Sequence, residues 1–540
     1  MADTTRTTPE ARDPAGVPAE DLRTPRHRTS TPEVADHAAT KWWTLVAVCL
    51  GTFMLLLDVT IVNVALPNIQ VDLGASFADL QWVIDAYALS LAALLLTAGS
   101  IADLFGRRRL YVIGLAVFTG ASLLCGIAGT PLLLQLSRGL QGVGGAVMFA
   151  VSLALLADAF RGKDRGTAFG IWGAVTGLAV AVGPLVGGAL VSGLSWRWIF
   201  FVNLPFGLLA IALTLRTVAE SKAPQARRPD WVGFLLFSTA LAALVYGLIE
   251  SNQAGFSSVK VWGSLLAAAA LLTAFVVAEA RGAHPMFDLA LFRLPTFSGG
   301  ATAAFGISAS IFAVLLYLTL YLQDVLGYTP LQTGLRLLVL SGGILATSTV
   351  AGRLSTKVPV RWLIGPGLLL VGTGLLLMRG LDATSTWVHL VPGLVVAGIG
   401  VGMINPPLAS TAVGVVRPQQ AGMASGINST FRQVGIATGI ALLGTLFANQ
   451  VSTYVAHHVG QIPDLAGRGD QLSTAIQSGG AGKVIGSAPP QAQAALIELT
   501  SSAFTTGLNF ILLVAAVVAL VAGVVSLLSI RTKDFAQQHG

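Results

Sequence analysis

Hydrophobic and polar positions alternate along the 540-residue chain as long apolar stretches separated by short polar connections. From Trp42 onward, fourteen stretches approach or exceed the roughly 20 residues that a helix needs to cross a bilayer. Their approximate limits are 42–67, 80–103, 110–129, 131–157, 166–193, 198–218, 231–250, 261–280, 297–322, 330–355, 362–379, 388–416, 420–448 and 503–530. The pattern therefore predicts an all-α membrane protein with fourteen spans.

The polar segments differ in length and divide the chain into regions. Thr, Pro and charged residues dominate the first 41 residues, which is typical of a disordered tail. A polar linker follows the sixth span, and a loop at 449–502 lies between the last two spans, with an amphipathic helix expected from Gln491. The expected regions are a cytoplasmic tail (1–41), an N-terminal six-helix bundle (42–218), a linker with two additional spans and an inner loop (219–296), a C-terminal six-helix bundle with the long outer loop (297–530) and a cytoplasmic tail (531–540).

Composition and charge agree with a chain embedded in lipid. Hydrophobic residues make up 54% of the sequence and charged residues 11%, whereas soluble domains carry about 25% charged residues. With the N-terminus inside, 18 of the 32 Lys and Arg residues fall in inner connections or the C-terminal tail, and 5 fall in outer connections. This distribution predicts a multi-pass protein of the cytoplasmic membrane with both termini in the cytosol. The net charge of +7 thus reflects topology, and no nucleic-acid partner is expected.

Asp58 is an acidic residue inside the first apolar stretch. A charged side chain at the centre of a spanning helix costs about 2.5–3.5 kcal/mol on insertion scales and usually marks a functional site. The sequence therefore indicates a proton or cation site at Asp58. The alternative is a structural ion pair within the helix bundle.

Arg138 is the expected partner of this acid. At a rise of about 1.5 Å per residue, Asp58 and Arg138 lie about 13 and about 10 Å below the outer ends of their spans. Gln141 follows Arg138 by three residues, shares its helix face and is a candidate for the substrate cavity. We expect an ion pair between Asp58 and Arg138 that protonation of Asp58 can break, which would make the pair a proton-coupled switch.

Asp85 is a second acid at membrane depth, close in sequence to Trp82 and Tyr87. A carboxylate with aromatic rings suits an organic cation, so these residues are candidates for proton coupling and for the substrate cavity. The alternative interpretation is that Trp82 and Tyr87 belong to the interfacial aromatic belt and that Asp85 is hydrated at the outer vestibule.

The second half contributes Arg432 near the middle of its span. Asn405, Asn428 and Gln433 are polar residues that can line the same cavity, and the sequence names no partner for Arg432. Arg336 lies six residues after Pro330 and can reach the outer interface without a functional role.

The inner connection after the second span reads Gly99-SIADLFGRRRLYVIG, and residues 352–365 are a degenerate echo of it. The spacing G-x3-D-x2-G-R-R-R resembles the loop of the major facilitator superfamily, in which it latches the two halves on the cytoplasmic side. The resemblance implies a cytoplasmic gate at Gly99, Asp103, Gly106 and Arg107. It also implies the major facilitator fold of two pseudo-symmetric six-helix bundles, here with two extra central spans.

Four further motifs, at residues 57–67, 136–146, 177–188 and 196–207, resemble the fourteen-span drug:proton antiporter family. The resemblance implies a proton-coupled antiporter that exports hydrophobic, cationic drugs or antibiotics by alternating access. The third motif is expected to act as a hinge, because its glycines permit close helix packing and its proline permits a bend. The hinge residues are Gly177, Gly183, Pro184, Gly187 and Gly188.

Other classes of protein lack support in the sequence. No phosphate-binding loop for an ATP-driven pump is found, and no clustered nucleophiles, acids or metal ligands indicate an enzyme. The adjacent His457 and His458 are interpreted as surface residues, so neither a metal nor a cofactor is expected and the proton gradient is the energy source. A proton-coupled importer or exporter of a specific metabolite stays open as an alternative. A monomer is expected to suffice for function.

Overall fold

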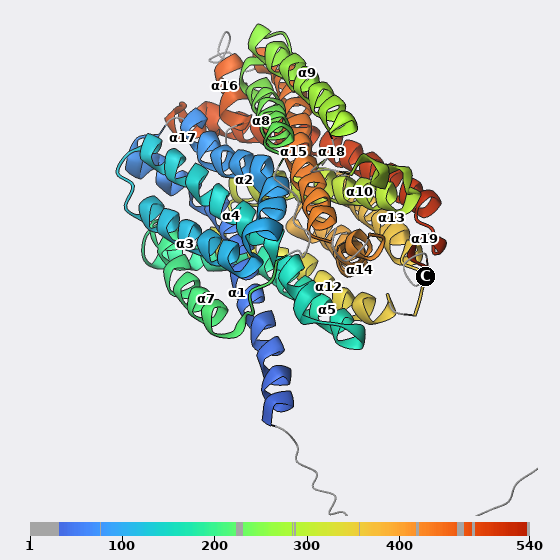
Figure 1. Cartoon of the computed structure of the whole chain (residues 1–540). Coiled ribbons are helices and arrows are strands. Elements are labelled where there is room, and N and C mark those ends of the chain that lie inside the picture. Colours follow the sequence, from blue (N-terminus) through green and yellow to red (C-terminus); the bar gives the residue numbers. More distant parts are fainter. Residues whose placement is uncertain are drawn as a thin grey trace, which may run out of the picture. The chain divides into compact units, whose positions relative to one another are not determined.

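The computed structural model describes residues 32–75, 77–222, 230–282, 285, 288–355, 357–416, 421–461, 469–477 and 481–536 (Figure 1). The described residues form helices joined by short connections, and none of them forms a strand. The long helices are α1 (Pro32–Leu73), α2 (Phe77–Phe105), α3 (Arg107–Gly126), α4 (Pro131–Ala159), α5 (Gly162–Gly193), α7 (Asn203–Thr217), α8 (Trp231–Ala254), α9 (Val259–Arg281), α10 (Pro295–Ile307), α12 (Pro330–Leu354), α13 (Arg361–Leu377), α14 (Val391–Gly414), α15 (Ala421–His458) and α18 (Pro490–Ser529).

Shorter elements complete the chain. They are α6 (Trp198–Phe201), α11 (Ala313–Leu320), α16 (Gly469–Gln477), α17 (Ala481–Ser487), α19 (Lys533–Ala536), the 3-10 segments η1 (Leu289–Arg293), η4 (Trp387–Leu390) and η6 (Val459–Gln461), and the π-helical segments η2 (Ser308–Phe312) and η3 (Tyr321–Val325). The all-α fold expected from the sequence is confirmed.

Each of the fourteen apolar stretches coincides with one or more of these helices. In the described part of the chain, eleven helices are long and apolar enough to cross a membrane, and two bent helix pairs raise the number to thirteen. The stretch expected at 362–379 forms the apolar helix α13, which is shorter than a full span. The chain is therefore a multi-pass membrane protein, and the number fourteen stays a prediction.

Two segments are more helical than the sequence analysis expects. The tail expected to be disordered over 1–41 is helical from Pro32, where a proline at the first turn and the nearby alanines favour a helix. Residues 1–31 lie outside the described part. The outer loop expected at 449–502 is also largely helical, since α15 continues to His458 and α18 begins at Pro490. The amphipathic helix expected from Gln491 is thus the start of the last span.

The buried apolar side chains form separate clusters in the two halves. Two clusters lie among residues 45–218, with Ala409 added from the second half. A third cluster lies among residues 303–530. Residues 1–39 form a unit of their own, and the body comprises residues 40–540. Within that body, α5 packs along α12 and α15 packs against α2 and α4, so both halves touch through helix pairs.

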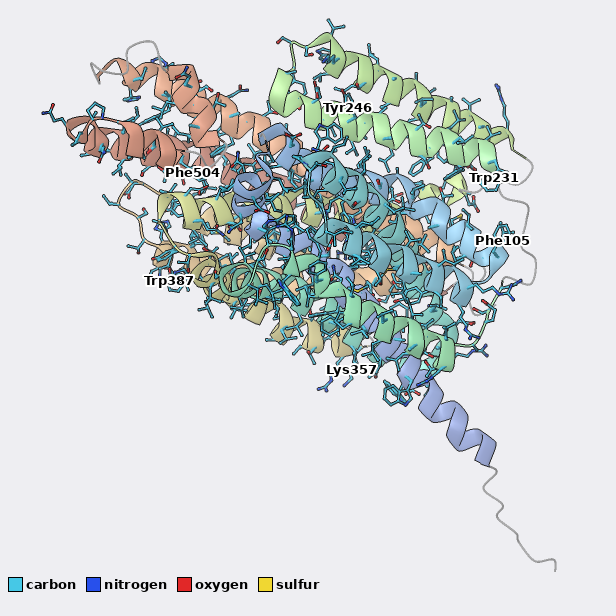
Figure 2. All side chains as sticks on the ribbon, turned by 90° about the vertical axis from the view of Figure 1, so that its left-hand side faces the viewer. Phe105, Trp231, Tyr246, Lys357, Trp387 and Phe504 are labelled. Atoms are coloured by element: carbon cyan, nitrogen blue, oxygen red, sulfur yellow. The ribbon has the colours of Figure 1, made fainter. Side chains whose placement is uncertain are left out.

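The two additional helices, α8 and α9, form a hairpin at one edge of the body (Figures 1 and 2). Their apolar residues cluster with the start of α10 and of α15, and α8 also contacts α2. In Figure 2, Phe105, Trp231 and Lys357 lie towards one end of the helices, and Trp387 and Phe504 lie towards the other. This is the alternation that the predicted topology requires of inner and outer connections.

Candidate functional site

Asp58 of α1 is enclosed by hydrogen-bond donors from two other helices. The Nη1 atom of Arg138, on α4, lies 2.5 Å from Asp58 Oδ2. The second carboxylate oxygen, Oδ1, accepts from Gln141 Nε2 at 2.8 Å and from Asn203 Nδ2, on α7, at 3.0 Å. Three donors on two oxygens match an ionised carboxylate, which only accepts hydrogen bonds.

The orientation of the Gln141 amide follows from its neighbours. Arg138 only donates, so Gln141 Oε1 faces Arg138 Nη1 at 2.6 Å and its Nε2 faces Asp58. The same Nε2 atom donates to Ser122 of α3 at 2.8 Å. Gln141 therefore bridges Asp58 and Arg138. This hydrogen-bond pattern holds only while Asp58 accepts hydrogen bonds and Arg138 donates them.

Arg138 is fixed on its remaining sides by α2. Its Nε donates to the carbonyl of Val83 at 3.1 Å, and its guanidinium carbon lies 4.3 Å from the centroid of the Tyr87 ring. A cation over an aromatic face is stabilised by the ring quadrupole. The network of Asp58, Arg138, Gln141 and Asn203, hereafter the Asp58 network, thus holds α1, α2, α4 and α7 together.

The Asp58 network is closed to solvent. Asp58 and Gln141 are 0% exposed, and Arg138 and Asn203 are 1% exposed. A buried pair of this kind is tolerated because its charges are matched and hydrogen-bonded, and loss of one partner leaves an uncompensated charge. The predicted contact between Asp58 and Arg138 is confirmed, and its role in proton coupling stays a prediction.

The sequence analysis did not identify Asn203 or Ser122. Asn203 lies five residues into the sixth span, about 8 Å below its outer end, which is close to the depth of Arg138. Its depth in the span is therefore a feature of the sequence that could have placed Asn203 near Arg138. Ser122 offers no such signal, because a serine in an apolar helix normally hydrogen-bonds its own backbone, as Ser122 does with the carbonyl of Phe118.

The aromatic residues near Asp85 take separate places. The side chain of Asp85 lies outside the described residues. Tyr87 is 3% exposed and covers Arg138, whereas the ring of Trp82 lies 6.0 Å from that of Tyr246 on α8. Tyr87 therefore belongs to the surroundings of the Asp58 network.

The glycines of the expected hinge lie against α1. A β-carbon placed on Gly183 would lie 2.7 Å from Thr60 Cβ, and one on Gly187 would lie 2.8 Å from Ile61 Cγ1. Both contacts are closer than ordinary β-carbons allow, so only glycine permits this approach of α5 to α1. Gly188 is buried as well.

The helix α5 bends by 40° between Ala179 and Val182. Pro184 explains the position, because proline removes the hydrogen bond to the carbonyl four residues earlier, that of Val180. On its other side α5 meets α12: a β-carbon on Gly177 would lie 2.8 Å from Ile344 Cγ2. The bend expected in this motif is present, and the helix contacts both halves.

Two residues of the expected cytoplasmic gate, Asp103 and Arg107, form an ion pair. Arg107 Nε donates to Asp103 Oδ1 at 2.9 Å, and Gly106 has φ 115°, a conformation that L-residues rarely adopt. Gly99 is buried in α2. Gating by this loop stays a prediction, because both members of the ion pair belong to the first half.

A residue that the sequence analysis missed, Glu220, closes this loop. Its carboxylate accepts from the backbone N–H groups of Arg108 and Arg109 at 3.1 and 3.2 Å, at the first turn of α3. An anion at a helix N-terminus satisfies free N–H groups and interacts favourably with the helix dipole. Nothing in the sequence near Arg108 indicates this contact, since the two residues are 112 positions apart.

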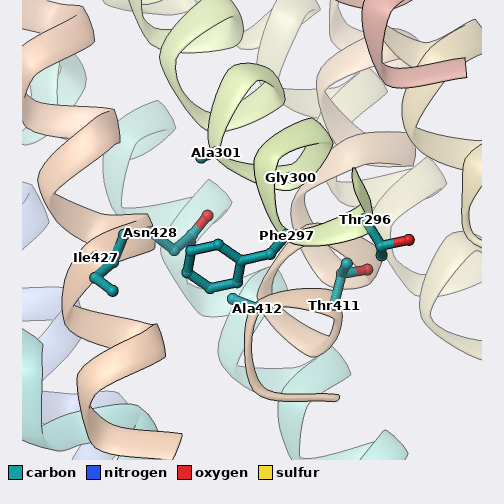
Figure 3. Close-up of a pocket in the computed structure, with 8 residues that line it drawn as sticks. All are labelled: Thr296, Phe297, Gly300, Ala301, Thr411, Ala412, Ile427 and Asn428. Atoms are coloured by element: carbon teal, nitrogen blue, oxygen red, sulfur yellow. The ribbon is translucent and has the colours of Figure 1, made fainter. Parts of the chain in front are cut away.

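The polar candidates of the second half lie on α14 and α15. Arg432 Nη2 donates to Asn405 Oδ1 at 3.1 Å, which identifies the partner that the sequence left open. Asn428 lies one turn before Arg432 and lines a cavity of about 10 Å³ between α10, α14 and α15 (Figure 3). Gln433 is half-buried.

The comparisons with known proteins agree with this arrangement. Residues 48–440 match the family model of the Major Facilitator Superfamily. The "Multidrug resistance protein Stp" of Mycobacterium tuberculosis (strain CDC 1551 / Oshkosh) is 40% identical over 427 residues, 79% of each chain. The "Tetracenomycin C resistance and export protein" of Streptomyces glaucescens is 34% identical over 490 residues, 90% of this chain and 91% of that protein.

Solved structures of low sequence identity share the fold. The proton:xylose symporter XylE aligns with a TM-score of 0.60 at 13% identity, over 92% of this chain and 97% of that chain. The human organic anion transporter MFSD10 aligns with a TM-score of 0.59 at 15% identity, over 89% of this chain and 99% of that chain. At such identities the likeness establishes the architecture alone.

Proposed function

Because the chain belongs to the major facilitator superfamily, we propose that it is a proton-coupled antiporter that exports hydrophobic drugs or antibiotics by alternating access. The resistance and export functions named for its relatives support the direction and the substrate class. The distribution of Lys and Arg supports insertion in the cytoplasmic membrane with both termini in the cytosol. The proton gradient supplies the energy, no cofactor takes part, and a monomer performs the cycle.

The observation that carries this proposal is the buried Asp58 network. The atoms of Arg138, Gln141 and Asn203 that contact the Asp58 carboxylate are all hydrogen-bond donors. A proton on the carboxylate would therefore find no acceptor among them. Protonation also removes the charge that compensates Arg138. The network therefore has two incompatible states. In one, Asp58 is ionised and the network is closed; in the other, Asp58 is protonated and the network is rearranged. A proton-driven switch requires two such states.

The helix α5 connects this switch to the second half. Thr60 and Ile61 follow Asp58 on α1 and lie against Gly183 and Gly187 of α5. One turn of α5 also meets α12, where a β-carbon on Gly334 would lie 2.8 Å from the backbone nitrogen of Leu185. A displacement of α1 can thus be passed to α12 through the close contacts that the glycines of α5 and α12 permit, and the bend at Pro184 is the place where α5 can change its shape.

The transport cycle uses the gradient in one direction. A proton enters from outside, neutralises Asp58 and favours the state that releases substrate outwards; return to the inward state delivers the proton to the cytosol. Each 100 mV of membrane potential contributes about 2.3 kcal/mol per charge moved. Asp85 and Trp82 are proposed to favour substrates that carry a positive charge.

The test is transport in inverted membrane vesicles that contain the full-length protein. An imposed proton gradient should drive accumulation of ethidium by the parent and not by Asp58→Asn. Asp72→Asn is the matched control, because Asp72 is on the same helix and pairs with Arg197 at the surface. If Asp58→Asn accumulates ethidium as fast as the parent, Asp58 is not the coupling residue. If a gradient drives no drug in the parent, the antiport proposal fails.

A further inference from the structure

Arg432 differs from Arg138 in having no acidic partner. It is half-buried on α15, about 16 Å from the start of that helix at a rise of about 1.5 Å per residue. Among the described residues it forms no ion pair, and its hydrogen bond goes to the neutral amide of Asn405. The second half therefore holds a cation at membrane depth that has no countercharge among the described residues.

Acidic residues are few in the second half, and none of those between its first and last spans lies near Arg432 in the sequence. After the last span, Asp534 of α19 accepts from Thr296, which lines the cavity beside Asn428. Between residues 295 and 530 the acidic residues are Asp324, Asp382, Asp464, Asp470 and Glu498. Asp324 ends the first span of this half, Asp382 follows α13, Asp470 lies at the start of α16, and Glu498 belongs to the first turns of α18, whereas Asp464 lies outside the described residues. The four described positions lie at the end of the helices opposite to the start of α15, so none of these four is at the depth of Arg432.

Asn428 provides a second observation at the same place. It is 6% exposed, its Oδ1 has no hydrogen-bond partner, and it lines the cavity of about 10 Å³. An unpaired buried acceptor costs about 1–3 kcal/mol, so a group without a partner among the described residues normally binds a water or a ligand. Asn428 and Arg432 are four residues apart and share one face of α15.

Aromatic rings lie beside Asn428. Phe297 lines the cavity beside Asn428 (Figure 3). The rings of Phe292 and Phe297 lie 5.3 Å apart, and those of Phe292 and Phe431 lie 5.9 Å apart. Phe431 directly precedes Arg432 in the sequence. The surroundings therefore suit a molecule that joins an aromatic body to a polar oxygen.

The cavity beside Asn428, about 10 Å³, has room for one water molecule at most, so a larger ligand requires α10, α14 and α15 to separate. We propose that in such a state of the transport cycle Arg432, Asn405 and Asn428 form a substrate site in the second half that binds an anionic oxygen, a carboxylate or phenolate, of an aromatic compound. Arg432 donates to the anionic oxygen, Asn405 holds the guanidinium in place, and Asn428 accepts from a hydroxyl group of the substrate or from a bridging water. The site rests on the proposed function, and it extends the substrate range from cations to aromatic acids. The substrate supplies the negative charge that the described neighbours of Arg432 do not provide.

Equilibrium binding separates this proposal from proton coupling. Purified full-length protein is titrated with three fluorescent aromatic anions, carboxyfluorescein, 2-naphthoate and salicylate, without any gradient. Arg432→Gln should weaken binding of at least one of them by about tenfold or more, because a charge-assisted hydrogen bond is lost. Arg432→Lys keeps the charge and should retain part of the affinity. Arg336→Gln is the matched control, an arginine of the same half that lies over the ring of Tyr328.

The outcomes are distinct. Anion binding that depends on Arg432, while binding of ethidium changes less than twofold, supports the site even if a gradient drives no transport. Equal binding by the parent and Arg432→Gln overturns the proposal, and so does the absence of binding of all three anions to the parent. An equal loss of anion and ethidium binding in Arg432→Gln also overturns it, because Arg432 then has a structural role.

Discussion

Thr60, two residues after Asp58 on α1, lies so close to Gly183 of α5 that a β-carbon on the glycine would approach Thr60 Cβ to 2.7 Å. The acid of the Asp58 network and the bent helix are therefore adjacent, and the contact is between a side chain and a bare backbone. Such a contact can slide without unlocking interdigitated side chains, which a helix that moves against its neighbour requires.

Gly183→Ala should lower transport and stability together. The added methyl group must push α5 away from α1, and overpacking of this kind costs about 1–3 kcal/mol. Ethidium efflux from loaded cells and the thermal unfolding midpoint in detergent measure the two effects. Gly193→Ala is the control on the same helix, because no atom lies within 4 Å of its added β-carbon. Equal behaviour of the two variants would show that the close approach of α5 to α1 is unimportant.

Removal of one charge from the Asp58 network should be worse for stability than removal of both. Arg138→Gln leaves the carboxylate of Asp58 buried without its cation, a change that costs about 3–5 kcal/mol. In Asp58→Asn/Arg138→Gln, four neutral side chains can exchange hydrogen bonds, so much of the stability should return while proton-driven transport does not. Thermal unfolding of the single and double variants gives the coupling energy. Additive losses would contradict a direct interaction between the two side chains.

The principal pair of the site was predictable because charge in lipid is conspicuous. Asp58 and Arg138 stand out by their cost, and counting residues from the span ends puts them at one depth. The neighbours of this pair are harder to foresee, since neutral amides and hydroxyls such as Asn203 and Ser122 are common between membrane helices. Their role depends on which helices meet, which the sequence of one helix does not specify.

Tyr87 shows where local reasoning fails. The sequence groups it with Asp85 because the two are close along the chain. Residues two apart on a helix point in different directions, and Tyr87 faces Arg138 of α4. The sequence analysis missed Glu220 for the opposite reason, since Glu220 is far from Arg108 in sequence and adjacent to it in space. The all-α class, in contrast, follows from hydrophobicity alone and needs no tertiary information.

Asp72 should make its end of the first half sensitive to acid. Hydrogen bonds from Trp196 and from Arg197 lower the pKa of the Asp72 carboxyl below its usual value of 3.8. A lowered pKa means that the contact stabilises the folded state above pH 3.8 and is lost as the pH falls through the lower, folded-state value. The parent should therefore be more stable than Asp72→Asn at pH 6, and the difference should shrink as the pH falls below about 4.

Thermal unfolding midpoints between pH 6 and pH 3 measure this difference for the Asp72 contact. Asp158→Asn, an exposed acid at the end of α4, is the control and should give a small difference at every pH. A gap between the parent and Asp72→Asn that stays constant down to pH 3 would contradict titration of Asp72 as its cause.

Glu220→Gln should loosen the first turn of α3 without unfolding the helix bundle. The carboxylate accepts from two backbone N–H groups, and a β-carbon on Gly106 would lie 2.6 Å from Glu220 Oε1, so the loop is built around this side chain. The neutral amide keeps one acceptor oxygen and loses the favourable charge at the helix N-terminus, a change of about 0.5–2 kcal/mol. Hydrogen exchange at the amides of Arg108 and Arg109 should become several-fold faster, while exchange in the rest of α3 stays unchanged. Glu250→Gln, near the C-terminal end of α8, serves as the control because it leaves the loop at Glu220 intact. If the amides of Arg108 and Arg109 exchange at the parental rate in Glu220→Gln, the carboxylate does not cap α3, and the conformation of Gly106 alone must hold the loop.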